Sequence, residues 1–144
     1  MTWDRSRRTP EDVARTLAQR LQHYEEHGFG VLAVLEKETG RLIGQCGLQY
    51  LKGTHEIELV AYTAKSEWRR GLAAEACTAM LDHAFLVMGT KSVLAVARVE
   101  NAAARTLCDK LGFMAVRGDR LYDADVAVYV LEAVRWLPTR THAR

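Results

Sequence analysis

Residues 68–76 have the composition of an anion-binding helix start. A strand pattern ends shortly before them, and the turn places Arg69 and Arg70 next to Gly71, where a helical pattern begins. The first amides of a helix have no intrahelical partner and lie at the positive end of the helix dipole, which favours a bound phosphate. The small residues Gly71 and Ala73 would let a phosphate approach the backbone. The segment alone also fits an ordinary helix start with solvated arginines.

Other kinds of reactive site are not supported by the residue spacing. Residues 68–76 lack the Lys-Ser/Thr end of a nucleotide P-loop and the three-glycine dinucleotide pattern. No metal-ligand spacing and no catalytic triad can be argued from the histidines, so we expect no metal. The cysteines are odd in number and have no close pair, which argues against a disulfide framework and favours a reducing compartment. These cysteines are Cys46, Cys77 and Cys108.

The composition is that of one ordinary globular domain. The chain has 144 residues, of which 49% are hydrophobic and 26% charged, and its net charge is +2. That charge is too balanced for a dedicated nucleic-acid or membrane-surface binder. No apolar run approaches the roughly 18 residues of a membrane span, and the polar start is not a signal peptide. We expect a cytoplasmic single domain over 1–144, with a core of about 10–131 and basic, flexible ends.

The elements that must position these residues follow from the hydrophobic pattern. Thr9 and Pro10 start a helix, and apolar residues continue at helical spacing until Gly28. The order α, β-β-β, α, β, α, β-β predicts a mixed α/β sheet, because a crossover helix joins the strand meander to a buried strand. The tail over 135–144 contains Pro138 and is expected to fray. The other predicted elements are strands at 31–35, 42–50 and 55–62, a helix at 71–88, a strand at 92–97, a helix from Asn101 to 111, and strands at 113–116 and 124–131 joined around 117–120.

Three separated strings resemble the GNAT superfamily of acetyl-CoA-dependent N-acetyltransferases, and most of all its branch of ribosomal-protein N-terminal acetyltransferases. The family's pyrophosphate loop runs Gln/Arg-x-x-Gly-x-Gly/Ala, and Trp68, Gly71 and Ala73 fit the variant of this branch. The resemblance covers about residues 10–131 in the same element order. It implies a GNAT-like α/β (α+β) fold with a mostly antiparallel sheet flanked by helices. The strings are residues 68–76, Glu100-Asn101-Ala102-Ala103-Ala104-Arg105 and Lys110-Leu111-Gly112-Phe113.

The resemblance implies that the chain transfers an acetyl group from acetyl-CoA to a primary amine, on a protein N-terminus or a small molecule. The strand with Val60 and Ala61 would splay from the strand at 92–97, and an amide near Ala61 would polarise the thioester carbonyl. Asn101 would hydrogen-bond the pantetheine arm, although a plain helix N-cap is an equally good local interpretation. The amides that would hold the pyrophosphate belong to Arg69, Arg70, Gly71, Leu72, Ala73 and Ala74.

Glu58 and Cys108 are the candidate catalytic residues that follow from the resemblance. Free amines have pKa values of about 8 to 10, so a base is useful. The branch often has Glu at the register of Glu58, although Glu56 and Glu58 would also fit a solvated strand face. Cys108 stands where many members have Tyr, and Ala104 where the branch commonly has Ser. Cys108 would protonate the leaving thiolate or be a buried apolar cysteine, in which case coenzyme A leaves as a thiolate.

The front of the chain departs from the family. The family fold begins with a strand and a helix ahead of the helix at 10–27, and nine residues cannot supply both. One wall of the family's acceptor site comes from that region, so the sequence leaves the amine open. The strand at 31–35 becomes a bare sheet edge, which we expect a second copy or residues 1–8 to cover. The alternatives are a coenzyme A-binding or interaction module without catalysis, and an RNA-associated protein that uses the basic tails.

Overall fold

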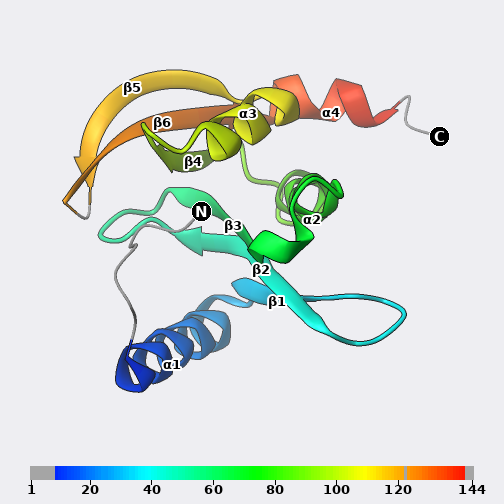
Figure 1. Ribbon diagram of the computed structural model, residues 1–144. Coiled ribbons are helices and arrows are strands. Elements are labelled where there is room, and N and C mark those ends of the chain that lie inside the picture. The colour runs from blue at the N-terminus through cyan, green and yellow to red at the C-terminus, as the bar shows by residue number, and fades with distance from the viewer. Residues whose placement is uncertain (1–8, 122, 142–144) are drawn as a thin grey trace.

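A computed structural model describes residues 9–121 and 123–141, in which six strands form one sheet of order β1-β2-β3-β4-β6-β5 (Figure 1). Neighbouring strands are antiparallel except for β3 and β4, which are parallel. The expected mixed and mostly antiparallel sheet is therefore confirmed. The strands are β1 (Val31–Leu35), β2 (Leu42–Tyr50), β3 (Ile57–Thr63), β4 (Ser92–Arg98), β5 (Met114–Leu121) and β6 (Ala124–Glu132).

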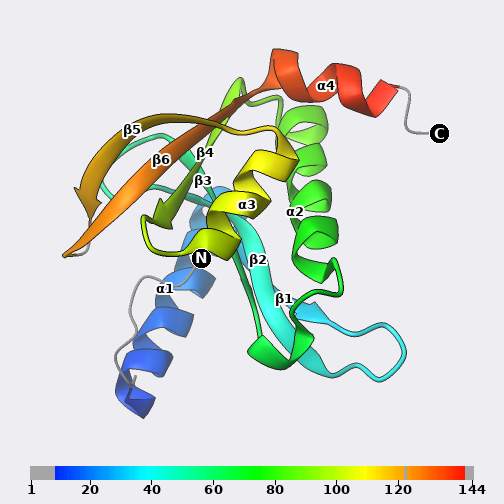
Figure 2. The same ribbon diagram turned by 45° about the horizontal axis from the view of Figure 1, so that its top comes forward.

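The helices lie on both sides of this sheet. Figures 1 and 2 show α2 and α3 together on one side and α1 on the other, below the strands in Figure 1. In the described ranges, none of the helices is long and apolar enough to cross a membrane. The helices are α1 (Pro10–His27), α2 (Leu72–Asp82), α3 (Ala102–Leu111) and α4 (Ala133–Thr141), with a 3-10 turn η1 (Lys65–Glu67) before α2 and a π-helical turn η2 (His83–Val87) continuing it.

Helix α1 begins and ends where the sequence predicts. The Thr9 hydroxyl accepts from the Asp12 amide and the Asp12 carboxylate accepts from the Thr9 amide, forming a capping box. Gly28 ends the helix in the left-handed conformation, with a φ of 77°. Side chains of the apolar stripe stay about half exposed, at 56% for Leu17 and 57% for Leu21.

A histidine attaches the C-terminal end of α1 to the sheet. His23 Nε2 accepts a hydrogen bond from the Tyr50 amide at 3.1 Å, and Nδ1 lies 3.0 Å from the Phe29 carbonyl oxygen. Because Nε2 accepts, the proton of the neutral ring is on Nδ1, which donates to that carbonyl. The His23 and Phe29 rings also meet edge to face. The His27 ring also meets the Tyr50 ring edge to face, so two histidines join the last turns of α1 to the end of β2.

The main hydrophobic core lies between the sheet and helices α2 and α3. Leu59 from β3 and Val93 from β4 meet Cys77 and Leu81 from α2 and Cys108 from α3 in one buried cluster. Strand residues alternate between the two faces of a sheet. Residues Leu59 and Ala61 of β3 therefore face the helices, while Glu58, Val60 and Tyr62 face the other side.

Strands β3 and β4 diverge after a single paired position. Glu58 pairs with Leu94, whereas β4 pairs with β6 along its whole length from Ser92 to Arg98. Beyond Glu58, β3 continues next to β2 only. The splay predicted between these two strands is therefore present, and it opens toward their C-terminal ends.

Two predicted segments need correction. Strand β5 runs to Leu121, so residues 117–120 are paired strand rather than a connection. The expected fraying of the tail is wrong up to Thr141, because residues 133–141 form helix α4, which is anchored to α2. The Trp136 ring is buried and its Nε1 donates to Asp82 at 2.9 Å, while Arg140 donates to both Asp82 carboxylate oxygens. Residues 142–144 and the segment 1–8, expected to fold back on β1, lie outside the described residues.

Candidate active site

A cavity of about 450 Å³ lies where β3 and β4 have separated. Its walls come from the end of β3, the segment between β3 and α2, the first turn of α2 and one side of α3. This volume is within the range of small-molecule sites. Of the residues expected at the coenzyme site, it is lined by Ala61, Arg69, Gly71, Leu72, Ala73, Ala74 and Asn101.

The start of α2 supplies backbone donors to this cavity. The first hydrogen bond within the helix joins the Glu75 amide to the Gly71 carbonyl at 3.0 Å. The amides of residues 72–74 therefore have no partner within the helix. Gly71 is the N-cap residue and has no side chain to satisfy these amides. The expected anion-binding geometry is thus present: amides at the positive end of a helix, with the small residues Ala73 and Ala74 next to them.

The loop before α2 holds two residues in the left-handed conformation. Arg69 has a φ of 68° and Gly71 a φ of 73°. A non-glycine residue such as Arg69 adopts this conformation at a cost and needs support from its surroundings. Part of the support comes from Trp68, whose Nε1 donates to the Thr63 carbonyl at 3.1 Å.

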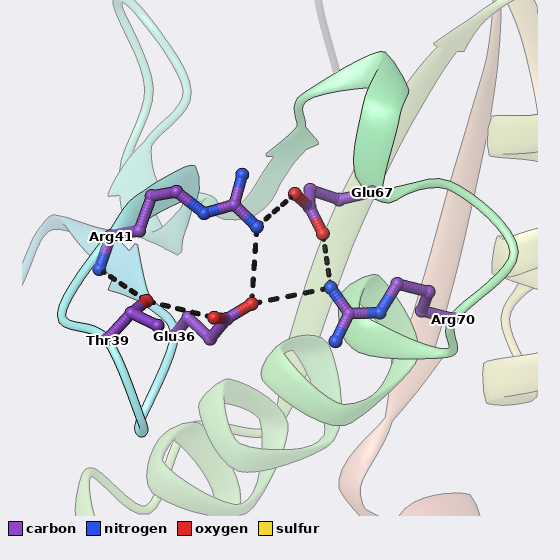
Figure 3. A network of polar contacts seen from close by, with 5 residues as sticks. All are labelled: Glu36, Thr39, Arg41, Glu67 and Arg70. Atoms are coloured by element: carbon purple, nitrogen blue, oxygen red, sulfur yellow. Dashed lines mark hydrogen bonds and ion pairs between the residues drawn. The ribbon is translucent and has the colours of Figure 1, made fainter.

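Two residues expected at the coenzyme site do not line the cavity. Val60 is 6% exposed and lies on the face of β3 away from α2 and α3. Arg70 points toward the β1–β2 hairpin, where its guanidinium pairs with Glu67 and Glu36 (Figure 3). The charge that the sequence assigned to Arg70 at the phosphate site is therefore neutralised by carboxylates, whereas Arg69 remains at the cavity wall.

Helix α3 forms the opposite wall. The Asn101 side-chain oxygen accepts from the Ala104 amide at 3.0 Å, so the predicted N-cap is confirmed, and the same residue lines the cavity. Asn101 can therefore cap α3 and still face a ligand in the cavity. Sequence reasoning did not place the other wall residues of α3, although their i, i+1, i+3, i+4, i+7 spacing from Ala103 was a usable signal. These are Ala103, Ala104, Thr106, Leu107 and Lys110.

Glu58 is buried at the point where β3 and β4 separate. Its side chain is 3% exposed, so the solvated-face alternative is wrong for Glu58, while Glu56 is exposed but precedes β3. Burial raises the pKa of Glu58, and a hydrogen bond of 3.0 Å from Gln49 Nε2 partly opposes this. A carboxylate whose pKa is raised is a stronger base than an ordinary one, which suits the role of general base.

Glu58 and the cavity lie on opposite faces of the sheet. Ala61, which lines the cavity, is three residues further along β3 and has the opposite side-chain direction. At about 3.3 Å per residue, their backbone positions are about 10 Å apart. A ligand in the cavity and a second reactant beside Glu58 would therefore approach the gap between the strands from opposite faces.

Cys108 has the environment of a structural cysteine. It is 1% exposed within the main core, and burial raises the pKa of its thiol to about 12. The thiol does not line the cavity. These features favour the buried apolar interpretation over the role of acid. Throughout residues 9–121 and 123–141, no three His, Cys, Asp or Glu side chains are grouped so as to hold a metal ion.

Comparison with known proteins identifies the family. The family model for the acetyltransferase (GNAT) domain matches residues 1–114. A GnaT-family acetyltransferase from Bordetella pertussis has a TM-score of 0.78 at 23% identity, over 85% of this chain and 77% of that one. A ribosomal-protein-S5-alanine acetyltransferase from Vibrio fischeri has a TM-score of 0.75 at 16% identity, over 93% of this chain and 80% of that one. The spermidine N-acetyltransferase from Vibrio cholerae, in complex with CoA and spermine, has a TM-score of 0.75 at 17% identity, over 93% of this chain and 81% of that one. With its splayed strands and its open helix start, this chain belongs to the GNAT acetyltransferases, a family that uses acetyl-CoA.

Proposed function

We propose that this chain is an N-acetyltransferase that moves the acetyl group of acetyl-CoA to a primary amine, on a protein N-terminus or a small molecule. The cavity between the diverging strands and the start of α2 carries the proposal, because it joins anion-binding amides to a gap in the sheet. The Vibrio cholerae neighbour, a spermidine N-acetyltransferase bound to CoA and spermine, supports an amine as acceptor.

In the proposed complex the coenzyme is held mainly by backbone groups. The amides of residues 72–74 donate to the pyrophosphate, and Arg69 and Lys110 supply positive charge at the cavity wall. The Asn101 oxygen caps α3, which leaves its side-chain nitrogen to donate to a pantetheine carbonyl. The acetyl group then lies beside Ala61, where the main chain of β3 stabilises the oxyanion that develops on the thioester carbonyl.

Glu58 is the proposed base, acting directly or through one water. The amine nitrogen forms a bond to the acetyl carbon, the carbon–sulfur bond breaks, and coenzyme A leaves as a thiolate. The proton lost by the amine goes to Glu58 or to the water that it holds. Cys108 has no part in this sequence, because its thiol is in the core.

The proposal is tested by following the release of free coenzyme A thiol with a panel of amines. The panel contains peptides with free alanine or serine N-termini, polyamines, aminoglycosides and amino acids. We expect acetyl-CoA turnover that depends on one class of amine, with the acetylated product found by mass spectrometry. Coenzyme A binding without turnover on any amine would favour the alternative of a binding module without catalysis.

A further inference from the structure

A polar cluster ties the loop before α2 to the β1–β2 hairpin. Figure 3 shows this hairpin clamp, which consists of Glu36, Thr39, Arg41, Glu67 and Arg70. The Glu67 carboxylate accepts from Arg41 at 2.6 Å and from Arg70 through its other oxygen. Glu36 accepts from Thr39 at 2.9 Å, from Arg41 at 3.3 Å and from Arg70 at 3.5 Å. The two guanidiniums thus bridge the two carboxylates.

Glu67 is the centre of the hairpin clamp. Its side chain is 4% exposed, whereas those of Arg41 and Arg70 are half exposed. Hydrogen bonds from Arg70 and Arg41 hold the pKa of Glu67 below its ordinary value, so the carboxylate stays charged. A buried carboxylate that loses its cationic partners is costly, which strongly favours this arrangement of the loop.

The hairpin clamp acts on the part of the loop whose backbone is most unusual. Arg70 lies between Arg69 and Gly71, and both neighbours are left-handed, at 68° and 73°. Successive amides in such conformations form a concave anion site. Holding Arg70 by its guanidinium therefore holds the backbone on either side of it.

We propose that the hairpin clamp, through Glu67, fixes the loop so that the amides at the start of α2 already converge before the pyrophosphate arrives. Glu67 is then a positioning residue, and Arg70 belongs to the support of the loop instead of touching the phosphates. This inference rests on the proposed function, because it assigns the loop to coenzyme A. A preformed loop binds more tightly since less ordering is required on binding.

The rival explanation is that Arg70 leaves the hairpin clamp and contacts the pyrophosphate directly. In that case Glu67 competes with the coenzyme for Arg70, and Glu67→Gln would leave binding unchanged or tighten it. If the hairpin clamp positions the loop, both Glu67→Gln and Arg70→Ala weaken binding by about tenfold. The double variant is then no weaker than the worse single variant, because either change already releases the loop.

The experiment titrates coenzyme A and pantetheine calorimetrically into the wild type, both single variants and the double variant. Pantetheine lacks the pyrophosphate, so its affinity should change less than twofold. Asp82→Asn is the control, since it breaks another ion pair, with Arg140, away from the cavity. It should lower the melting temperature and leave coenzyme A affinity unchanged. Equal loss of both ligands in Glu67→Gln, or tighter coenzyme A binding, would overturn the inference.

Amide hydrogen exchange separates this inference from the proposed function. In the protein without ligand, Glu67→Gln should speed exchange about tenfold at the amides of Trp68 and Glu75, which donate to the Lys65 and Gly71 carbonyls on either side of the loop, while Asp82→Asn should not. Unchanged exchange there contradicts the role of the hairpin clamp, whatever the coenzyme does. Failure of the wild type to bind coenzyme A contradicts the proposed function instead.

Discussion

Replacing Gly71 with alanine tests the loop geometry with one methyl group. A Cβ at Gly71 would meet nothing within 4 Å, so the substitution causes no clash, but the φ of 73° is strained for any L-residue. That strain is about 1–2 kcal/mol. The variant without ligand relieves this strain by rotating residue 71 out of the left-handed conformation against the hold of the hairpin clamp, and coenzyme binding must then restore that conformation. The same free energy corresponds to a Kd raised about 5- to 30-fold.

Gly53 offers a matched control for this prediction. It has a φ of 78°, it also has open space at its Cβ position, and it lies in the turn between β2 and β3, away from the cavity. Gly53→Ala should lower the melting temperature by about 2–8 °C, since its strain is the same. Its coenzyme A affinity, measured by calorimetry, should stay within twofold of the wild type.

The reasoning is refuted if Gly71→Ala binds coenzyme A within twofold of the wild type. Gly71→Pro is the stronger change, because proline removes the amide and cannot adopt a positive φ. It should abolish detectable binding.

Other predictions concern the base, the buried thiol and the sheet edge. Glu58→Gln should lower turnover about 10²-fold with coenzyme A binding intact; near-native turnover from pH 6 to 9 would remove Glu58 as the base. Because the pKa of Glu58 is raised from 4.5, its stabilising effect is present below that pH and is lost as the pH rises through the folded value. Glu58→Gln should therefore gain melting temperature relative to the wild type between pH 4 and pH 8, and a constant difference would contradict the burial argument. Cys108→Ala should keep turnover within about threefold after correction for unfolded protein, and a 10²-fold loss would restore Cys108 as the acid. In the described sheet β1 pairs only with β2, so we expect a second copy or residues 1–8 to cover its free edge: light scattering should find a dimer at tens of micromolar, or a monomer should exchange its amides at 31–35 slowly, and a strict monomer with rapidly exchanging amides there would refute this.

The sequence was most informative where the signals are local. The Thr9 cap, the Gly28 stop and the Asn101 cap fixed helix ends that the structure confirms. The glycine and small residues at 71–74 likewise indicated the open helix start, because amide geometry there depends on neighbours in the chain.

The missed features depend on residues far apart in the chain. Helix α4 is held through Asp82, which is 54 residues from Trp136, so nothing near the tail indicated that it would be ordered. The pairing of Arg70 with Glu36 spans 34 residues and was hidden for the same reason. Residues 117–120 are exposed on both faces of β5, so they show no alternation of burial by which a strand is recognised.

The burial of Glu58 was also beyond the sequence. Glu56 and Glu58 are the same residue type and two positions apart, which in a strand predicts the same face and the same exposure. Glu56 is nevertheless exposed, whereas Glu58 is 3% exposed. The difference arises because Glu56 precedes β3, whereas Glu58 lies within it and pairs with Leu94 of β4, a parallel strand that follows a helical crossover. The residues of β3 alone do not predict a contact with Leu94 of β4, which lies more than 30 residues further along the chain than Glu58.

The most direct test of the central claim is a crystal structure of the chain with acetyl-CoA. We predict that the pyrophosphate oxygens accept hydrogen bonds from amides of residues 72–74, and that the acetyl group reaches the gap between β3 and β4 beside Ala61. Arg70 should remain paired with Glu67 in the same crystal. Coenzyme density elsewhere on the protein, or a pyrophosphate held by side chains with no amide contact at the start of α2, would contradict the account.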